Sequence, residues 1–259
     1  MQPRSQSIES RIQERFGRAA AAYAVSPVHR GGPDLDAMLA AAALTGRERV
    51  LDLGCGPGHA AAAFAPHAAE VVALDLTEAM LETGRVLAAE RGLSNLRFER
   101  GDAARLSFPD ASFERVTSRH SAHHFSDPRA VLREVARVLK PGGAFLLVDT
   151  VAPENPALDT FLNAFEVLRD PSHVRDHTVS QWCDMLRAVG LEASSLGSFA
   201  SAQEFDAWVA RIGTSPAAVK GLQALFDEAP EEVRAAFGIR GQGRYDFRLE
   251  FALIRGARA

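Results

Sequence analysis

The chain has 259 residues, of which 47% are hydrophobic and 24% charged, and its formal net charge is −4. It is long enough to bury a full core, and we expect one catalytic domain with insertions. No apolar run approaches the roughly 18 residues of a membrane span, and residues 1–18 lack the apolar centre of a signal peptide. Arginines alternate with acidic residues, so neither a membrane nor a nucleic acid is expected as a partner.

Cysteine is rare in this sequence. Cys55 lies in a glycine-rich turn and Cys183 in a helical stretch, so neither needs a redox role. This usage fits a reducing compartment, and we expect the protein in the cytoplasm. The oligomeric state stays open, with a homodimer as one expectation.

The N-terminal part of the chain predicts helices. Residues 8–23 place Ile8, Ile12 and Phe16 on one face, which favours an amphipathic helix packed as a lid. A second helix is expected over residues 33–44.

A strand and a glycine-rich turn follow. Residues 49–53 form an apolar run of the kind found in buried parallel strands, and Gly54, Gly56 and Gly58 come next. Glycine lets the backbone turn sharply and approach a ligand, and the helix expected from His59 adds free N–H groups at the same place. The dinucleotide fingerprint would need glycine where the chain has His59, which disfavours a nicotinamide oxidoreductase.

Two further strands end in acidic residues. Residues 70–75 finish at Asp75, and the strand over residues 95–100 is followed by Asp102. A carboxylate at the tip of the strand next to the glycine turn can accept both hydroxyls of a ribose. Asp52, Asp75 and Asp102 together indicate a nucleoside-type cofactor more specifically than any one of them does.

A fourth strand is expected over residues 113–118. The catalytic residues are expected in the loop after it, because ligands of doubly wound sheets lie beyond the carboxyl ends of the strands. Histidine titrates near neutral pH, so His124 is our first candidate for a general base and His120 the second. Arg119 is expected to bind a carboxylate of the cofactor or the substrate. His120, His123 and His124 lack a clear carboxylate or cysteine partner and are weak evidence for a zinc site, so no metal is expected.

Three motifs point to one family. Residues 52–58 read D-L-G-C-G-P-G, residues 109–113 read P-D-A-S-F, and residues 139–143 read L-K-P-G-G before a fifth strand. Over residues 47–150 the chain therefore resembles class I S-adenosylmethionine-dependent methyltransferases, in the small-molecule branch that includes the ubiquinone and menaquinone C-methyltransferases.

The resemblance implies an α/β fold, a Rossmann-like seven-stranded and mostly parallel sheet with helices on both faces. Residues 1–45 would be the helical lid and residues 46–150 the cofactor-binding core. Residues 151–180 would be a helical insertion over the acceptor pocket. Residues 181–259 would complete the domain with a helical cap and a final antiparallel strand, for which the alternating residues 245–254 are suited.

The resemblance also implies S-adenosyl-L-methionine as the cofactor. Asp52 would lie near its ammonium group, Asp75 near the ribose, and Asp102 near the adenine amino group. Tyr23 and His29 could reach the positive sulfur, because aromatic faces attract cations. The residues expected to hold the cofactor are Tyr23, Asp52, Gly54, Cys55, Gly56, Asp75, Leu76, Met80, Gly101, Asp102, Ala103 and Arg119.

The acceptor pocket is expected beneath the insertion, with contacts from His29, His123, Arg169, His173 and Arg175. A loop with salt bridges to Asp170 and Asp176 is the alternative for the last three.

Farther along the chain, a strand is expected over residues 191–199. A capping box of Ser201 and Glu204 is expected before a helix over residues 205–212.

We therefore predict methyl transfer to a small-molecule acceptor at oxygen, nitrogen or carbon. Two alternatives remain open. One is an S-adenosylmethionine-dependent enzyme that does not methylate, such as a cyclase, lyase or pericyclase, and the other is a cofactor-binding module without turnover.

Overall fold

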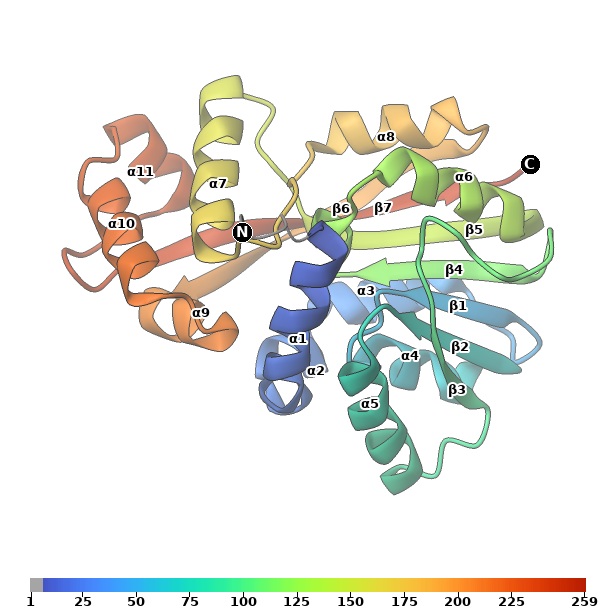
Figure 1. The fold of residues 1–259 in the computed structure, drawn as a ribbon. Helices are drawn as coiled ribbons and strands as arrows, with labels where there is room; N and C mark the ends of the chain where they lie inside the picture. The colour runs from blue at the N-terminus through green and yellow to red at the C-terminus, as the bar shows by residue number, and fades with distance from the viewer. Residues whose placement is uncertain (1–6) are drawn as a thin grey trace, which may run out of the picture.

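The computed structural model describes residues 7–259, which form a seven-stranded sheet with helices on both faces (Figure 1). The strand order is β3-β2-β1-β4-β5-β7-β6, with β1 to β5 parallel and β7 antiparallel to both of its neighbours. This confirms the predicted α/β fold. The strands are β1 (Arg49–Leu53), β2 (Glu70–Asp75), β3 (Leu96–Arg100), β4 (Phe113–Arg119), β5 (Leu139–Thr150), β6 (Glu192–Glu204) and β7 (Asp246–Ala257).

The register of the parallel strands brings their carboxyl ends to one edge. Leu53 at the end of β1 pairs with Leu74 of β2 on one side and with Ser118 of β4 on the other. Asp75 at the end of β2 pairs with Arg100 at the end of β3. The loops that follow these strands therefore meet in one place.

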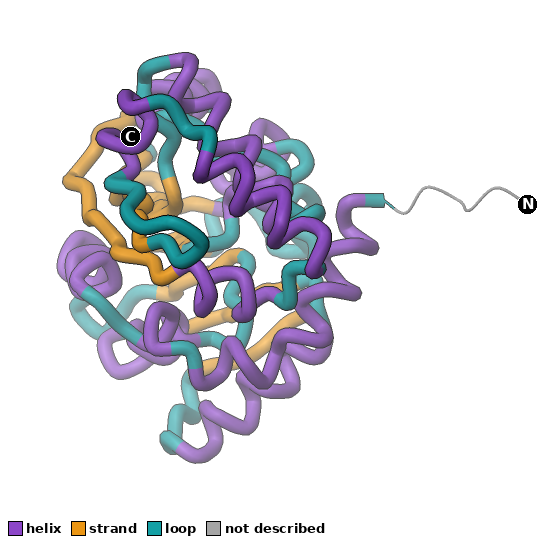
Figure 2. Tube along the Cα trace, turned by 90° about the vertical axis from the view of Figure 1, so that its left-hand side faces the viewer, coloured by secondary structure: helices purple, strands orange, loops and turns teal. Residues whose placement is uncertain are grey.

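The two faces of the sheet bury alternate residues of each strand. Val50 of β1 packs with α3 (Pro33–Ala42) and α4 (His59–Phe64). Leu51 and Leu53 pack instead with α6 (Pro128–Val138) and α8 (Val179–Ala188). The strands thus form an inner layer between helices, as the view in Figure 2 shows.

The N-terminal helix α1 (Ile8–Val25) stands in front of the carboxyl ends of the strands (Figure 1). It packs against α5 (Glu78–Glu90) on one side and against α9 (Phe205–Ile212) on the other. A short helix, α2 (Pro27–Arg30), connects it to α3. Helix α1 is thereby in contact with both the parallel core and the C-terminal helices.

Four helices gather at one end of the molecule, around the far halves of β6 and β7 (Figure 1). They are α7 (Pro156–Arg169), α9, α10 (Pro216–Asp227) and α11 (Glu231–Phe237). Aromatic rings fill the space between them, with Phe165 and Trp208 at 5.8 Å and Phe226 and Phe247 at 5.3 Å between ring centroids. These edge-to-face contacts anchor the inserted helices on the sheet.

The predicted capping box of Ser201 and Glu204 is wrong. Strand β6 runs to Glu204, and Ser201 pairs with Leu249 of β7. The hydroxyl of Ser201 accepts a hydrogen bond from Gln203 Nε2 (2.8 Å), and α9 begins without a side-chain cap. Pairing with β7 extends the strand through the residues that the motif would have used.

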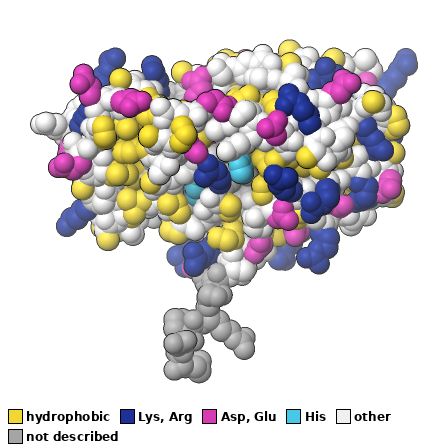
Figure 3. Space-filling view, turned by 90° about the horizontal axis from the view of Figure 1, so that it is seen from above, with side chains coloured by type: hydrophobic (Ala, Val, Ile, Leu, Met, Phe, Trp, Pro, Cys, Tyr) yellow, Lys and Arg dark blue, Asp and Glu magenta, His cyan; other side chains and the backbone are white. Residues whose placement is uncertain are grey.

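Within residues 7–259, no helix has both the length and the apolar character needed to cross a bilayer. The face seen from above in Figure 3 mixes basic and acidic side chains. The mixture seen in Figure 3 agrees with the alternation of basic and acidic residues in the sequence.

Replacing Phe226 with alanine should lower the free energy of unfolding by about 3–5 kcal/mol, because the fully buried ring packs against several others. Urea unfolding measures the loss, and Phe226→Leu, which keeps most of the volume, should lose less. Equal stability of the wild type and Phe226→Ala would contradict this account of the helical cluster.

Candidate functional site

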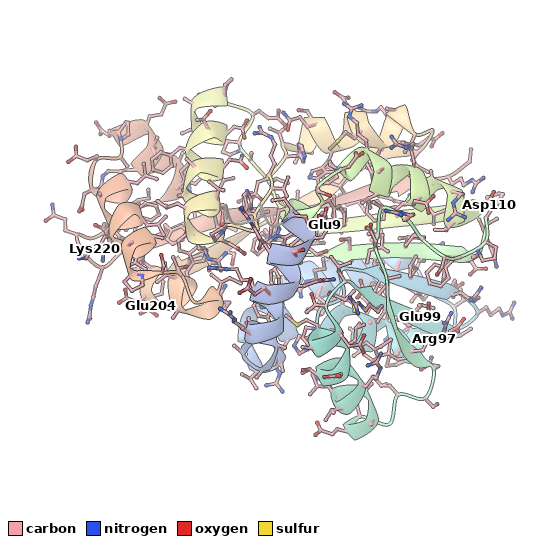
Figure 4. The ribbon with its side chains drawn as sticks, viewed as in Figure 1. Glu9, Arg97, Glu99, Asp110, Glu204 and Lys220 are labelled. Atoms are coloured by element: carbon pink, nitrogen blue, oxygen red, sulfur yellow. The ribbon has the colours of Figure 1, made fainter. Side chains whose placement is uncertain are left out.

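A cleft with a volume of about 150 Å³ lies between α1 and the carboxyl ends of the parallel strands. Its walls are formed by the glycine turn and by the loops after β2, β3 and β4. Glu9, on the first turn of α1 (Figure 4), also lines it. Every residue that the sequence predicted to hold the cofactor lines this one cleft. Their contacts with the cofactor remain predictions, but the fold brings them together.

The backbone of the glycine turn is held close to its neighbours. Gly54 has a φ of 63°, and a Cβ there would lie 2.5 Å from the hydroxyl oxygen of Ser121. That hydroxyl donates to the Leu53 carbonyl (3.2 Å), which fixes the loop after β4 against the turn. A side chain at position 54 would therefore separate two walls of the cleft.

Asp75 is positioned by two backbone N–H groups. Its Oδ2 accepts from Gly56 and its Oδ1 from Thr77, each at 2.8 Å. Burial raises the pKa of the Asp75 carboxyl. Each oxygen keeps a further lone pair, so the carboxylate can still accept two ribose hydroxyls.

Asp52 has one satisfied and one unsatisfied oxygen. Its Oδ1 accepts from the Thr117 hydroxyl (2.8 Å), whereas Oδ2 is buried and has no hydrogen-bond partner within residues 7–259. Burial raises the pKa of this carboxyl to about 7. A buried acceptor without a partner is costly, and an ammonium group in the cleft would satisfy it.

The loop after β3 forms the remaining wall. Asp102 Oδ1 accepts from the Ala104 N–H (2.8 Å), and Met80 is buried on α5 while lining the cleft. Carboxylates thus face the cleft from the ends of three neighbouring strands, next to apolar side chains. This donor and acceptor set fits S-adenosylmethionine, with Asp52 for its ammonium and Asp75 for its ribose.

His59, the residue that breaks the dinucleotide fingerprint, has a structural partner. Its Nε2 donates to the Tyr23 carbonyl at 3.1 Å, which joins the start of α4 to α1. Burial lowers the pKa of His59, so the ring is neutral at neutral pH. Its remaining N–H group is the one that donates to the Tyr23 carbonyl. Apart from the unexpected position of a histidine, no pattern in the sequence indicates this contact.

A second, inner cavity of about 60 Å³ lies beside the cleft. Phe16, Tyr23, His29, His120 and His124 line both spaces. Ring centroids lie 4.9 Å apart for Phe16 and His124 and 4.6 Å apart for Tyr23 and His29. The two cavities therefore meet at a boundary of aromatic and imidazole rings, which we call the ring boundary.

Two adjacent histidines differ in charge. His123 Nδ1 lies 2.7 Å from Asp149 Oδ1, and although burial alone would lower its pKa, the charge of Asp149 raises the pKa of His123 to about 9. His124 Nδ1 donates to the Ser172 carbonyl (3.0 Å), and burial and the charge of His123 lower its pKa. At neutral pH His123 is a cation, whereas His124 is neutral and has a free lone pair on Nε2.

His120, like His29, is a further neutral histidine at the ring boundary. Burial lowers its pKa, and its Nε2 lies 3.3 Å from Asp34 Oδ2. Its φ of 54° is unusual for a residue other than glycine. Such a conformation costs free energy and is most often found at functional sites.

Arg119 lines the cleft, and most of its guanidinium N–H groups already donate hydrogen bonds to other residues. Nε donates to Asp34 (2.7 Å), and Nη1 and Nη2 donate to the carbonyls of His29 and Gly31. These bonds hold the segment between α1 and α3 against the end of β4. Its predicted contact with a carboxylate of the cofactor or the substrate stays a prediction.

Of the predicted acceptor contacts, the structure places His29, His123 and Arg169 in the inner cavity. The ring of His173 stacks on that of His123, with centroids 5.7 Å apart, and its Nε2 is hydrogen-bonded to Asn163 Oδ1 (3.2 Å). Arg175 forms an ion pair with Asp159 of α7 rather than with Asp170 or Asp176. His173 and Arg175 do not line the inner cavity.

Sequence reasoning missed other residues of the inner cavity. Glu166, Gln203, Trp208 and Arg211 line it from α7, β6 and α9. The inserted helix α9 is far from the motifs in sequence, so only the fold reveals its contribution.

One group of described residues has the composition of a metal site. Ligand atoms of His123, Asp149 and Asp176 lie within 4.8 Å of one another, and both Asp176 oxygens are buried without a hydrogen-bond partner in the described chain. Burial raises the pKa of Asp176 well above its usual value. Protons on His123 and Asp176 would balance this cluster, and the expectation of no metal stays a prediction.

Known proteins match most of the chain. Residues 51–147 match the methyltransferase domain family. The uncharacterized methyltransferase YcgJ of Bacillus subtilis is 42% identical over 245 residues, which cover 93% of this chain and 96% of YcgJ. The demethylmenaquinone methyltransferase of Clavibacter sepedonicus is 42% identical over 109 residues, less than half of either chain.

Solved structures agree with the sequence matches. The crystal structure of YcgJ superposes with a TM-score of 0.85 at 41% identity, covering 87% of this chain and 97% of that one. A putative methyltransferase from Bacillus halodurans gives a TM-score of 0.85 at 39% identity, with 88% and 99% covered.

If Asp52 Oδ2 binds the cofactor ammonium, affinity for S-adenosylhomocysteine should rise roughly tenfold from about pH 6 to about pH 8, as a carboxyl with a pKa near 7 loses its proton. The raised pKa places the change in this range, and the ionised form is the one that binds. Calorimetric titration measures it. Asp52→Asn should bind more weakly and with little pH dependence; the same pH profile in both proteins would rule out this role.

Proposed function

The chain belongs to the class I S-adenosylmethionine-dependent methyltransferases, as its motifs predicted, and we propose that it methylates a small-molecule acceptor held in the inner cavity. The acceptor atom is oxygen, nitrogen or carbon. Transfer takes place at the ring boundary between the cleft and the inner cavity.

The observation that carries this proposal is the shared lining of the two cavities. The cofactor residues line the cleft, and five rings separate it from a second space deep enough for a reacting group. A cavity of about 60 Å³ admits a few water-sized groups but no folded macromolecule. An acceptor that enters it would have its nucleophile directed toward the cleft.

S-adenosylmethionine supplies an electrophilic methyl group on a positively charged sulfur when bound. Asp52 at the ammonium and Asp75 at the ribose would together fix the orientation of the cleft ligand. Tyr23 and His29 line both cavities at the boundary, where an aromatic ring face would favour positive charge. Alignment and exclusion of water at this boundary are the main contributions of the protein.

His124 can accept a proton from the methyl acceptor. Its Nε2 is the free nitrogen of a neutral ring, because Nδ1–H is fixed by the Ser172 carbonyl. His123 is a cation held by Asp149 and is unsuited to accept a proton. His120, whose ring is also neutral, remains the alternative base.

The test begins with purified protein, S-adenosylmethionine and a panel of small nucleophiles. Mass spectrometry should detect S-adenosylhomocysteine together with a methylated acceptor. Methylthioadenosine would instead indicate attack at another carbon of the cofactor, and binding without any product would indicate a module without turnover. Either result would overturn the proposal.

Replacing His124 with alanine should lower kcat by roughly 100-fold or more, the usual contribution of a positioned general base. Affinity for S-adenosylhomocysteine should change little, because the cofactor contacts remain. His67→Ala, at an exposed histidine remote from the cleft, is the matched control. Unchanged kcat in His124→Ala would remove this residue as the base and transfer the test to His120.

A further inference from the structure

Two arginines line the inner cavity, and they differ in their partners. Arg169 Nη1 lies 3.3 Å from Glu166 Oε2, its Nε donates to the Trp208 carbonyl (3.2 Å), and its guanidinium lies 4.6 Å from the centre of the Trp208 ring. Arg211, on the last turn of α9, is half-buried. Its guanidinium has no hydrogen bond or ion pair with any residue that the structure describes.

The position of Arg211 is electrostatically unfavourable in the protein alone. Burial and the neighbouring positive charge of Arg169 both lower its pKa. The nearby acidic group, Glu166, is already paired with Arg169. Placing a half-buried guanidinium beside another one costs free energy unless an anion is present.

Arg211 also lines a second space, an outer groove between α1 and α9. Arg11, Arg15 and Arg18 line this groove from α1, with Glu14 among them. Arg15 contacts Asp170 (3.1 Å) and Arg18 contacts Glu14 (2.7 Å), which leaves an excess of positive charge. The chain as a whole has a net charge of −4, so the local charge of the groove is opposite in sign to that of the whole chain.

We propose that the methyl acceptor carries a carboxylate or phosphate group and that Arg211 binds this group where the inner cavity meets the outer groove. The planar guanidinium can donate two parallel hydrogen bonds to either oxyanion. The reacting end of the acceptor then lies in the inner cavity, toward His124. This inference rests on the proposed function and specifies the class of acceptor.

The carboxylate of the cofactor is the competing ligand for Arg211. The cleft that holds the predicted cofactor residues is lined by Arg119 but not by Arg211. Tyr23 and His29 belong to the ring boundary between that cleft and the inner cavity. The placement of Arg211 on the far side of the boundary therefore favours the acceptor.

Anion binding can be tested without a known acceptor. Benzoate and inorganic pyrophosphate are titrated separately, at low ionic strength, into the protein saturated with S-adenosylhomocysteine, since salt screens such contacts. At least one probe should bind the wild type, and Arg211→Gln should weaken that binding at least tenfold. Arg211→Lys, which keeps the charge but not the paired donors, should weaken it less. The two probes distinguish a carboxylate from a phosphate preference.

Arg244→Gln, at a highly exposed arginine that lines neither the inner cavity nor the outer groove, is the matched control and should bind like the wild type. Equal probe affinity of the wild type and Arg211→Gln would overturn the proposal. So would a tenfold loss of S-adenosylhomocysteine affinity in Arg211→Gln, which would assign this arginine to the cofactor. Unfolding curves of both variants check that the fold is retained.

A second measurement compares methyl transfer to an acidic acceptor with transfer to its neutral ester or alcohol. The wild type should prefer the acid at least tenfold in kcat/KM, and Arg211→Gln should lose this preference. Equal use of acid and neutral acceptors would overturn this inference and leave the proposed function intact. Absence of any methylated product would refute the proposed function, while the titrations would still report on the anion site.

Discussion

The register of the parallel strands is the constraint on which the rest of the site depends. Because β1, β2, β3 and β4 end at one edge, a glycine turn, two acidic strand ends and a histidine loop converge there without any long-range motif in the sequence. A Cβ added to Gly54 would lie 2.5 Å from the Ser121 hydroxyl oxygen, which shows how closely the two loops approach. The unsatisfied oxygen of Asp52 supports the proposal that the cleft binds a ligand with a positive group.

The opposite half of the site comes from outside the parallel core. Helix α1 contributes Phe16 and Tyr23, and it is held by contacts with α5, α9 and His59. The buried ion pair of Arg119 with Asp34 fixes the following segment, and removal of either partner would leave a buried charge. The ring boundary is therefore assembled from the lid and the core together, which allows one side to hold the cofactor and the other the acceptor.

The sequence predicts the core of this protein well, because its motifs are local. Strand, glycine turn and acid follow one another within residues 49–58, and strand and acid within residues 70–75, so neighbouring residues alone carry each pattern. Residues that act through tertiary packing could not be found in this way. Arg211 reaches the cavity only because α9 is inserted between β6 and β7, and the Ser201 motif was overridden by strand pairing. The charges of His123 and His124 depend on Asp149 and Ser172, which are distant in sequence.

A crystal structure with bound S-adenosylhomocysteine tests the central claim most directly. The account predicts the ammonium within hydrogen-bond distance of Asp52 Oδ2, the ribose hydroxyls on Asp75, and the sulfur facing the ring boundary near Tyr23 and His124. A ligand whose sulfur points away from the inner cavity, or whose ammonium lies far from Asp52, would contradict it.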